Sequence, residues 1–350
     1  MRRGTDATTP PPDTAPVTAT DARRAAAPSE GDGNGSPPPA VEVAVAVAGR
    51  LVDAVGSVVR GKDDAVRLAV VALLSGGHLL VEDIPGTGKT LLGKSLATAI
   101  GGRFGRVQCT PDLLPADLTG TSVFAPSGGE WEFRPGPVFA NVVLLDEINR
   151  ASPRTQAALL EPMEERQVTV DGRTHALPDP FVCIATQNPF GHAGTFPLPE
   201  SQLDRFAMVL TIGWPDRGAE REVLSGAGGT PAFAALAPVA SPAELRAAVL
   251  ATRQVHCAPA AMEYVLDLCE ATRHHPQIML GASPRGSLTL LHAAQAHAAV
   301  TGRAYVTPDD VQAVLAATLA HRVVLGGGFD TAAATALLVD VVHHVAVPTG

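Results

Sequence analysis

The chain has 350 residues, an apolar fraction of 46% and a formal net charge of −9. Its length allows one large domain or two ordinary ones plus a tail, with enough apolar residues for buried cores. Its acidic balance argues against non-specific binding to DNA or RNA, which requires a basic face. The 4 cysteines are scattered without a C-x-x-C spacing, which predicts reduced, mostly buried thiols rather than a disulfide or zinc framework.

Residues 1–39 are rich in Pro, Ala, Thr, Gly and Asp and contain almost no large apolar side chains. Such a segment cannot bury enough surface to offset its ordering entropy, so we expect a disordered tail that acts as a spacer. Two arginines open the chain, but no apolar run follows them, so a signal peptide is not expected. Apolar stretches elsewhere are too short for a membrane span, which takes about 20 residues. The sequence therefore predicts a cytoplasmic protein without a membrane span.

The next segment begins with two predicted helices, over residues 41–59 and 61–77. Gly76-Gly77 is expected to end the second helix. The apolar run HLLVED then leads into a glycine-rich loop, and TLLGKSLATAI after the loop has helical spacing. Strand, glycine turn and helix form the context that a phosphate-binding loop requires.

Further strands and two hairpins follow. The predicted strands are the short apolar runs RVQCT, NVVLLDEINR, PFVCIATQNP and MVLTIGWP. The predicted hairpins are TSVFAPSGGEWEF, around an S-G-G turn, and QVTVDGRTHAL, around Asp171-Gly172. Between them, SPRTQAALLEPMEER is expected to form a helix with Ser152 as N-cap and Pro153 at the first position.

From Arg217 to the end, nearly the whole sequence has a helical pattern, as in AELRAAVLATRQV and TPDDVQAVLAATLAHRVV. Strands that alternate with helices indicate a mostly parallel sheet with helices on both faces. The expected fold class is therefore α/β. We expect a three-layer αβα domain over residues 40–216 and a separate all-helical domain over residues 217–350.

The stretch VEDIPGTGKT resembles the phosphate-loop pattern G-x-x-x-x-G-K-[ST], except that Asp83 stands where the first glycine is expected. Gly86 and Gly88 would let the backbone approach the phosphates, and its N–H groups would cradle them. Lys89 would place a positive charge on the β- and γ-phosphates, and Thr90 would offer a hydroxyl to Mg²⁺. Asp83 lies where the strand leaves the sheet, so it removes no donor from the cradle. Nucleotide binding is therefore predicted.

Polar residues at the ends of two other predicted strands fit the same chemistry. Asp146 and Glu147 follow the buried run VVLL, at the sheet edge where ligands bind in such folds. Asp146 would hold Mg²⁺, while Glu147 would orient and activate the attacking water. Asn188, at the end of FVCIATQN, could also hold that water. Taken alone, the carboxylates also fit a solvated strand-to-helix turn, and Asn188 is a weak signal.

Arginines can stabilise the charge that develops in phosphoryl transfer, in cis or in trans. Arg205, in LPESQLDRF, and Arg285, in GASPRGSL, are the candidates. By spacing alone, each is more simply interpreted as an ordinary surface or salt-bridged arginine.

Several long motifs in order resemble the MoxR family of AAA+ ATPases, over about residues 45–345. The motifs are GHLLVEDIPGTGKT, QCTPDLLPADLTG, GPVFANVVLLDEINRASPRTQAALLEPMEERQVTVDG, PFVCIATQNP, GTFPLPESQLDRF, GASPRGSL and YVTPDDV. The resemblance implies an AAA+ core followed by a helical lid, and an aspartate is common in that family where Asp83 stands. It also implies a nucleotide site made of Val59, Gly61, Pro85, Gly86, Thr87, Gly88, Lys89, Thr90 and Leu91.

The same resemblance implies a role for each remaining candidate. Asp146 and Glu147 match Walker B, Asn188 matches the sensor-1 residue, and the lid residue Arg285 matches the sensor-2 arginine, in cis or in trans. Arg205 matches the arginine finger that reaches the ATP of a neighbouring subunit. ATP, Mg²⁺ and a homo-oligomeric ring, expected to be a hexamer, follow from the resemblance. So do pore-facing hairpins and a chaperone-like role toward partners that often contain a von Willebrand A domain.

Two positions depart from the family pattern. Pro162 stands inside the helix after Walker B, where proline removes a backbone hydrogen bond and should kink the helix. The Gly191-His192-Ala193 stretch lacks the acidic residue that often precedes GTFPLPE. Neither departure touches the core chemistry, so they bear on remodelling geometry rather than on ATP hydrolysis.

Three alternative functions are also compatible with parts of the sequence. A DNA-acting motor related to the MCM proteins would share the two hairpins, but the acidic balance and the few Lys and Arg in the hairpins argue against it. A magnesium-chelatase ATPase subunit is close in architecture. A nucleotide-gated scaffold that barely hydrolyses ATP would not need Glu147.

Overall fold

Five short apolar runs form one parallel sheet, with the strand order β2-β5-β8-β1-β9. Its strands are β1 His78–Glu82, β2 Phe104–Gln108, β5 Val142–Asp146, β8 Val182–Gln187 and β9 Phe206–Leu210. Strands β5 and β9 are buried along their whole length, as expected where helices cover both faces of a parallel sheet. The α/β fold class and all five predicted strands are confirmed, and β9 begins at Phe206, two residues before the predicted run.

The structure, a computed structural model, describes residues 39–125, 129–188, 194–226, 228–328 and 330–348. Nearly all of the predicted N-terminal tail, and the Gly191-His192-Ala193 stretch, lie outside the described residues. By its contacts the chain from Pro37 onward forms one unit, so the predicted domain boundary at residues 216 and 217 stays a prediction.

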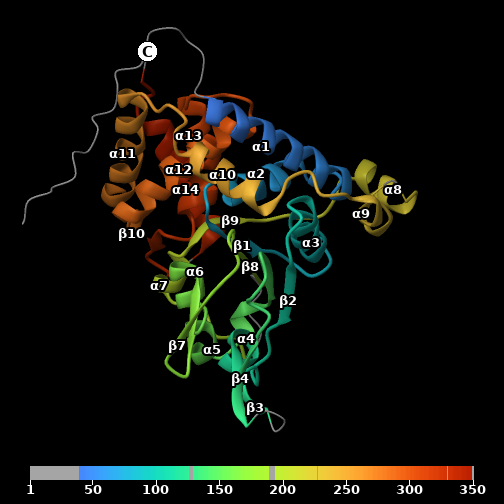
Figure 1. Ribbon diagram of the computed structural model, residues 1–350. Coiled ribbons are helices and arrows are strands. Elements are labelled where there is room, and N and C mark those ends of the chain that lie inside the picture. The colour runs from blue at the N-terminus through green and yellow to red at the C-terminus, as the bar shows by residue number, and fades with distance from the viewer. Residues whose placement is uncertain (1–38, 126–128, 189–193, 227, 329, 349–350) are drawn as a thin grey trace, which may run out of the picture. The chain divides into compact units, whose positions relative to one another are not determined.

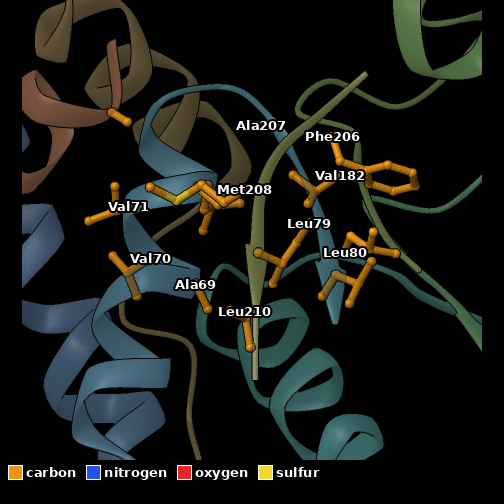
Figure 2. Close-up of a cluster of buried hydrophobic side chains, with 14 of the residues drawn as sticks. Ala69, Val70, Val71, Leu79, Leu80, Val182, Phe206, Ala207, Met208 and Leu210 are labelled. Atoms are coloured by element: carbon orange, nitrogen blue, oxygen red, sulfur yellow. The ribbon is translucent and has the colours of Figure 1, made fainter. Parts of the chain in front are cut away.

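Helices pack on the sheet as the sequence pattern predicts (Figure 1). The first three helices are α1 Pro39–Val58, α2 Asp63–Leu74 and α3 Lys89–Ala99, and α1 packs on α2 and α3. Helix α2 packs on β1 and β9, and α3 packs on β2 and β5. Figure 2 shows apolar side chains of α2 facing those of β1 and β9. Helix α2 ends at Leu74 with Ser75 as its C-cap, and Gly76 then takes a positive φ of 73°, which a glycine adopts without strain.

The strands of both predicted hairpins pair and the two pairs touch one another, while residues 127–128 of the predicted S-G-G turn lie outside the described residues. Strands β3 Gly120–Ala125 and β4 Glu130–Pro135 pair antiparallel, as do β6 Gln167–Val170 and β7 Arg173–Ala176. Asp171 and Gly172 have φ values of 50° and 74°, the left-handed backbone of a two-residue hairpin turn. The rings of Phe133 and His175 stack with centroids 3.9 Å apart and link the two hairpins. In Figure 1 the strands β3, β4 and β7 extend from the sheet on the side away from α1.

The helix predicted after β5 is interrupted rather than continuous. It consists of a 3₁₀ turn at Ile148–Arg150, then α5 Pro153–Ala157 and α6 Leu160–Glu165. Ser152 caps α5 as predicted, because its Oγ accepts a hydrogen bond from the N–H of Thr155 at 3.3 Å. The break at residues 158–159 fits Pro162, which has no N–H for the carbonyl four residues earlier.

The C-terminal part is mostly helical, with α8 Arg217–Leu224, α9 Thr230–Ala235, α10 Pro242–Thr252, α11 Pro259–His274, α12 Pro284–Val300, α13 Pro308–Leu319 and α14 Thr331–His344. Short helices α4 Pro115–Thr119 and α7 Glu200–Leu203 lie earlier in the chain. A small antiparallel pair, β10 Ile278–Leu280 with β11 Val324–Leu325, was not predicted, because these strands are too short to show a period of two. In the part of the chain that is described, no helix is long and apolar enough to cross a membrane.

Candidate functional site

The glycine-rich loop joins β1 to α3 at the carboxyl edge of the sheet. Gly86 and Gly88 have φ values of 90° and 100°, in the left-handed region that favours glycine. A Cβ built on either glycine would meet no described atom within 4 Å, so space is open beside the loop. Gly88 is also the N-cap of α3, so the free N–H groups of the first helical turn lie at this loop. This geometry suits an anion such as a phosphate.

Asp83 fastens the loop to the end of the neighbouring strand. Its side chain is 4% exposed, and its Oδ2 accepts hydrogen bonds from the N–H groups of Ile212 at 3.0 Å and Gly213 at 2.8 Å. Its Oδ1 accepts from the N–H of Ile84 at 2.7 Å. The aspartate in place of the usual glycine therefore connects the loop to the chain that leaves β9.

Lys89 folds back onto its own loop. Its Nζ donates to the carbonyls of Asp83 at 2.9 Å and Ile84 at 2.8 Å. Partial burial lowers the pKa of Lys89 from its ordinary value, and the nearby carboxylates of Asp83, Asp146 and Glu147 oppose that shift. A phosphate at the loop would replace these carbonyls as the partner of the ammonium group.

A cavity of about 210 Å³ lies against this loop and gathers most of the predicted residues. The predicted residues that line it are Pro85, Gly86, Lys89, Thr90, Asp146, Glu147 and Asn188. They come from the carboxyl ends of β1, β5 and β8, three neighbouring strands of the sheet. Asp83, Arg106, Gln108, Thr186 and Gln187 complete the lining.

Each of the two acidic residues at the carboxyl end of β5 is paired with an arginine. The Asp146 carboxylate is buried, and its Oδ2 accepts from Arg106 Nε at 2.7 Å. Glu147 has a φ of 56°, its N–H donates to Thr186 Oγ1 at 2.9 Å, and its Oε2 accepts from Arg150 Nη1 at 2.9 Å. The backbone of Glu147 is thus held by the neighbouring strand β8, while its side chain lies on an exposed arginine.

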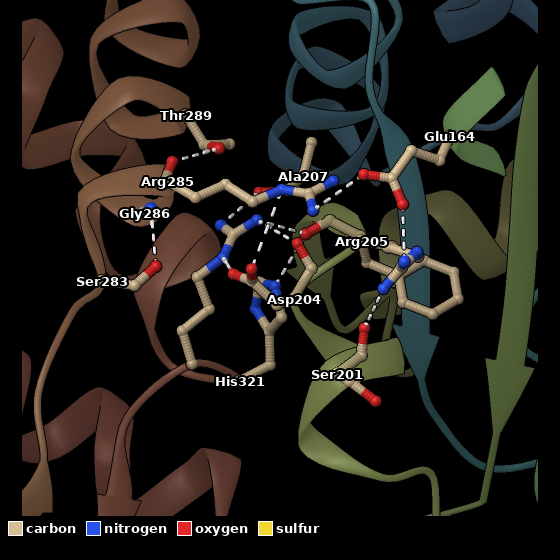
Figure 3. A network of polar contacts seen from close by, with 12 residues as sticks. Glu164, Ser201, Asp204, Arg205, Ala207, Ser283, Arg285, Gly286, Thr289 and His321 are labelled. Atoms are coloured by element: carbon tan, nitrogen blue, oxygen red, sulfur yellow. Dashed lines mark hydrogen bonds and ion pairs between the residues drawn. The ribbon is translucent and has the colours of Figure 1, made fainter. Parts of the chain in front are cut away.

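Arg205 and Arg285 converge on one carboxylate, Glu164 of α6 (Figure 3). Arg205 Nη2 lies 2.5 Å from Glu164 Oε2, and Arg285 Nη1 lies 3.6 Å from Glu164 Oε1. Arg285 Nε also lies 3.7 Å from Asp204 Oδ2, whose other oxygen accepts from the buried Arg322 at 2.9 Å. Among the described residues that line the nucleotide cavity, neither Arg205 nor Arg285 occurs.

The remaining predicted residues lie next to the cavity or apart from it. Thr87 and Gly88 belong to the same loop, and Leu91 follows in the first turn of α3. Val59 is buried at the end of α1. A Cβ on Gly61 would lie 2.2 Å from the Cβ of Ala219 in α8, so Gly61 allows a close helix contact. The structure does not bring Val59 or Gly61 into the lining of the cavity.

The sequence reasoning missed Arg106, Gln108 and Arg150 as members of this region. Arg106 and Gln108 alternate along β2, so both lie on one face of that strand. Their position beside Asp146 depends on the pairing of β2 with β5, in which Gln108 is opposite Asp146. The alternation of polar and apolar residues along β2 could be seen in the sequence, but the pairing of β2 with β5 could not.

The residues present fit Mg·ATP. The open space at Gly86 and Gly88 is a cradle that a Cβ would fill, and Lys89 supplies a cation beside it. The Asp146 carboxylate and the Thr90 hydroxyl are oxygen ligands of the kind that Mg²⁺ prefers. The fold and this loop together define a P-loop nucleotide-binding protein of the α/β class.

Comparisons with known proteins give the family. The family model "ATPase family associated with various cellular activities (AAA)" matches residues 78–208, and the model "AAA lid domain" matches residues 270–340. The chain is 45% identical over 302 residues to the Bacillus subtilis protein YeaC, covering 86% of this chain and 94% of that protein. It is 42% identical over 287 residues to Chaperone MoxR1 of Mycobacterium tuberculosis, covering 79% of this chain and 75% of that protein.

A solved structure agrees with these relatives. The crystal structure of a Cytophaga hutchinsonii protein described as an ATPase superposes with a TM-score of 0.79 at 33% sequence identity, covering 88% of this chain and 98% of that chain. The chain therefore belongs to the MoxR family of AAA+ ATPases, and it is an ATPase by family.

Proposed function

We propose that the protein hydrolyses Mg·ATP in a ring of identical subunits and uses the energy to remodel partner proteins. The observation that carries the proposal is the cavity at the carboxyl edge of the sheet. There the phosphate loop, the two acidic residues at the end of β5 and Asn188 after β8 line one space. These groups come from three strands that the sequence separates by many residues, and together they provide each part that phosphoryl transfer to water requires.

Each group has a proposed task at the reacting phosphate. The N–H groups of the loop and the Lys89 ammonium bind the phosphate oxygens. Thr90 and Asp146 would hold Mg²⁺, which supplies positive charge to the β- and γ-phosphates when bound. Glu147 accepts a proton from the attacking water, once its carboxylate leaves Arg150. Asn188 orients that water from the neighbouring strand.

The arginine cluster supports a shared site. Arg205 and Arg285 lie together on Glu164 rather than in the cavity of their own subunit. Two guanidinium groups held side by side are suited to one phosphate group, and a neighbouring subunit offers such a group. We propose that both arginines act in trans on the same nucleotide.

The ring is proposed to be a hexamer, and the role toward its partners is proposed to be chaperone-like. Chaperone MoxR1, a relative at 42% identity, carries that function in its name. The two hairpins, which contact each other through Phe133 and His175, are the proposed elements that move a client. A von Willebrand A domain is the proposed kind of client, and the cytoplasm is the proposed location.

The test of a shared site mixes two inactive subunits. Glu147→Gln removes the base and keeps Arg205, whereas Arg205→Gln removes the arginine and keeps the base. Each variant alone should release phosphate from Mg·ATP at less than about a hundredth of the wild-type rate. Their mixture should recover a measurable part of that rate. In a mixed ring, an Arg205→Gln subunit still has its own Glu147, and a Glu147→Gln neighbour supplies Arg205 to the same site, so that site is complete.

Arg221→Gln, an exposed arginine of α8, mixed with Glu147→Gln serves as the matched control for dilution of wild-type sites. If the inactive pair stays inactive when mass measurement shows mixed rings, Arg205 does not act in trans. The mass of the Glu147→Gln assembly with Mg·ATP should correspond to six subunits. A single assembly of any other mass would reject the hexamer.

A further inference from the structure

A second cavity, of about 180 Å³, lies at the opposite edge of the sheet. Gly76 precedes β1 and Phe181 precedes β8, and both line this cavity. The nucleotide residues follow the same two parallel strands. Because parallel strands have their carboxyl ends at one edge, the two cavities lie at opposite edges of the sheet. The second cavity therefore has no part in the proposed hydrolysis.

Three arginines from two elements surround this second cavity. Arg166 follows α6, Arg246 is on α10, and Arg253 is the C-cap of α10. A Cβ built on Gly76 would lie 3.8 Å from both Arg166 Nη2 and Arg253 Nη2, so these two guanidinium groups point at the same spot. In a chain with a net charge of −9, such a local concentration of positive charge is unusual.

Only one carboxylate balances these arginines among the described lining residues. Asp179 Oδ1 lies 3.2 Å from Arg166 Nη1, and Asp179 Oδ2 lies 3.4 Å from Arg246 Nε. Each Asp179 oxygen is thus already paired with one arginine. The cavity retains donors on Arg246 and Arg253 for an anionic group from outside, because each guanidinium carries five N–H donors.

The backbone that carries Arg253 is fixed from the helical part of the chain. The buried Gln295 of α12 donates from Nε2 to the carbonyls of Arg253 at 3.2 Å and Val255 at 3.0 Å. These hydrogen bonds tie the backbone at the end of α10 to α12. The arrangement is therefore built by three separate elements and is not a loose group of surface side chains.

The remaining wall of the cavity is apolar. Leu73, Phe181, Val182 and Val249 contribute to it, and Leu250 at its mouth is 54% exposed. An apolar wall beside a group of arginines suits a ligand that carries an anionic group next to an apolar group. A polynucleotide lacks aliphatic groups to cover such a wall, and the overall negative charge of the chain opposes it.

We propose that this cavity binds an acidic segment of a partner polypeptide, with a carboxylate on Arg246 and Arg253 and a neighbouring apolar side chain against Leu250. The site adjoins the second hairpin, because the carbonyl of Arg166 accepts from the N–H of Leu177 at 2.9 Å and closes the base of that hairpin. A partner held here lies beside the element proposed to move a client.

The test uses a short fluorescein-labelled peptide of alternating Glu and Leu, with fluorescence anisotropy and the full chain. Removing two of the arginines with Arg246→Gln/Arg253→Gln should weaken binding about tenfold or more, because charge-assisted hydrogen bonds are lost. The matched control Arg221→Gln, on α8, should bind as the wild type does. Asp179→Asn should strengthen binding severalfold, because the competing carboxylate is removed.

The opposite results would overturn the proposal. A Gln and Leu peptide that binds equally well would show that the carboxylates contribute nothing. An oligothymidylate of equal charge that binds as tightly would indicate a general polyanion surface. Unchanged affinity in the double arginine variant, or weaker affinity in Asp179→Asn with unchanged thermal unfolding, would place the peptide elsewhere. Since no nucleotide is needed, these results are independent of the proposed hydrolysis.

Discussion

Arg106 on β2 donates a hydrogen bond from Nε to Asp146 Oδ2 on the neighbouring strand β5, at 2.7 Å. The Asp146 side chain is 9% exposed, whereas the Arg106 side chain is 50% exposed. The carboxylate proposed to hold Mg²⁺ is therefore already neutralised by a guanidinium. A metal ion at Asp146 shares the carboxylate's negative charge with that guanidinium and is repelled by its positive charge, so Arg106 opposes metal binding.

Replacing Arg106 should make Mg²⁺ bind more readily. We expect Arg106→Gln to lower the Mg²⁺ concentration for half-maximal ATP binding by about threefold to tenfold, since the half-exposed pair is partly screened by water. The measurement is a Mg²⁺ titration of ATP binding in a Glu147→Gln background, which prevents turnover. Arg103→Gln, an exposed arginine just before β2, is the matched control. A higher Mg²⁺ requirement in Arg106→Gln would mean that Arg106 assists the nucleotide instead.

Mixing of two arginine variants can decide whether Arg285 acts in cis or in trans. If Arg205 and Arg285 of one subunit serve the same neighbouring site, every site in a mixture of Arg205→Gln and Arg285→Gln lacks one arginine. We then expect no recovery of phosphate release above the mean of the two variants. If Arg285 acts in cis, an Arg205→Gln site beside an Arg285→Gln neighbour is complete, and activity should rise on mixing.

The local parts of the site could be predicted from the sequence, because each depends on neighbours in the chain. The loop with Gly86, Gly88 and Lys89 follows from the strand, turn and helix pattern, and Asp146 follows from the buried run before it. The pairing of Arg106 with Asp146 could not be predicted, because strand order is set by packing between distant segments.

Two further sets of contacts could not be predicted from the sequence for the same reason. Nothing in the sequence around Glu164 predicts its ion pairs, because its partners Arg205 and Arg285 lie far along the chain. Asp83 was recognised as a tolerated departure, but its role as an acceptor for Ile212 and Gly213 required the position of β9 beside β1. Long-range pairing, rather than residue type, decides both.

The contacts of Asp83 predict a stability effect. Asp83→Ala should leave the N–H groups of the buried Ile212 and the partly buried Gly213 without this acceptor. We expect the free energy of unfolding to fall by about 1–3 kcal/mol, measured by urea denaturation. Asp83→Asn keeps one carbonyl oxygen and should lose less. Equal losses in the two variants would contradict this account.

The buried His78 gives the protein a stability that depends on pH. Its Nε2 contacts the Met163 carbonyl at 2.8 Å, and its Nδ1 accepts from the N–H of Cys183 at 3.1 Å. Burial lowers the pKa of His78 to about 4, opposed by the Met163 contact and assisted by the charge of Arg166. The ring is therefore neutral in the folded protein at neutral pH.

Because the folded pKa of His78 is below its ordinary value of 6.5, the unfolded chain binds the proton more tightly. The stabilising contribution is thus complete above about pH 6.5 and is lost as the pH falls toward 4. Each pH unit in this window should cost about 1.4 kcal/mol of unfolding free energy at most. His78→Gln offers the same donor and acceptor without a proton to gain, so urea denaturation between pH 7 and pH 5 should show a smaller loss than in the wild type. Identical pH dependence in both proteins would show that His78 does not carry the effect.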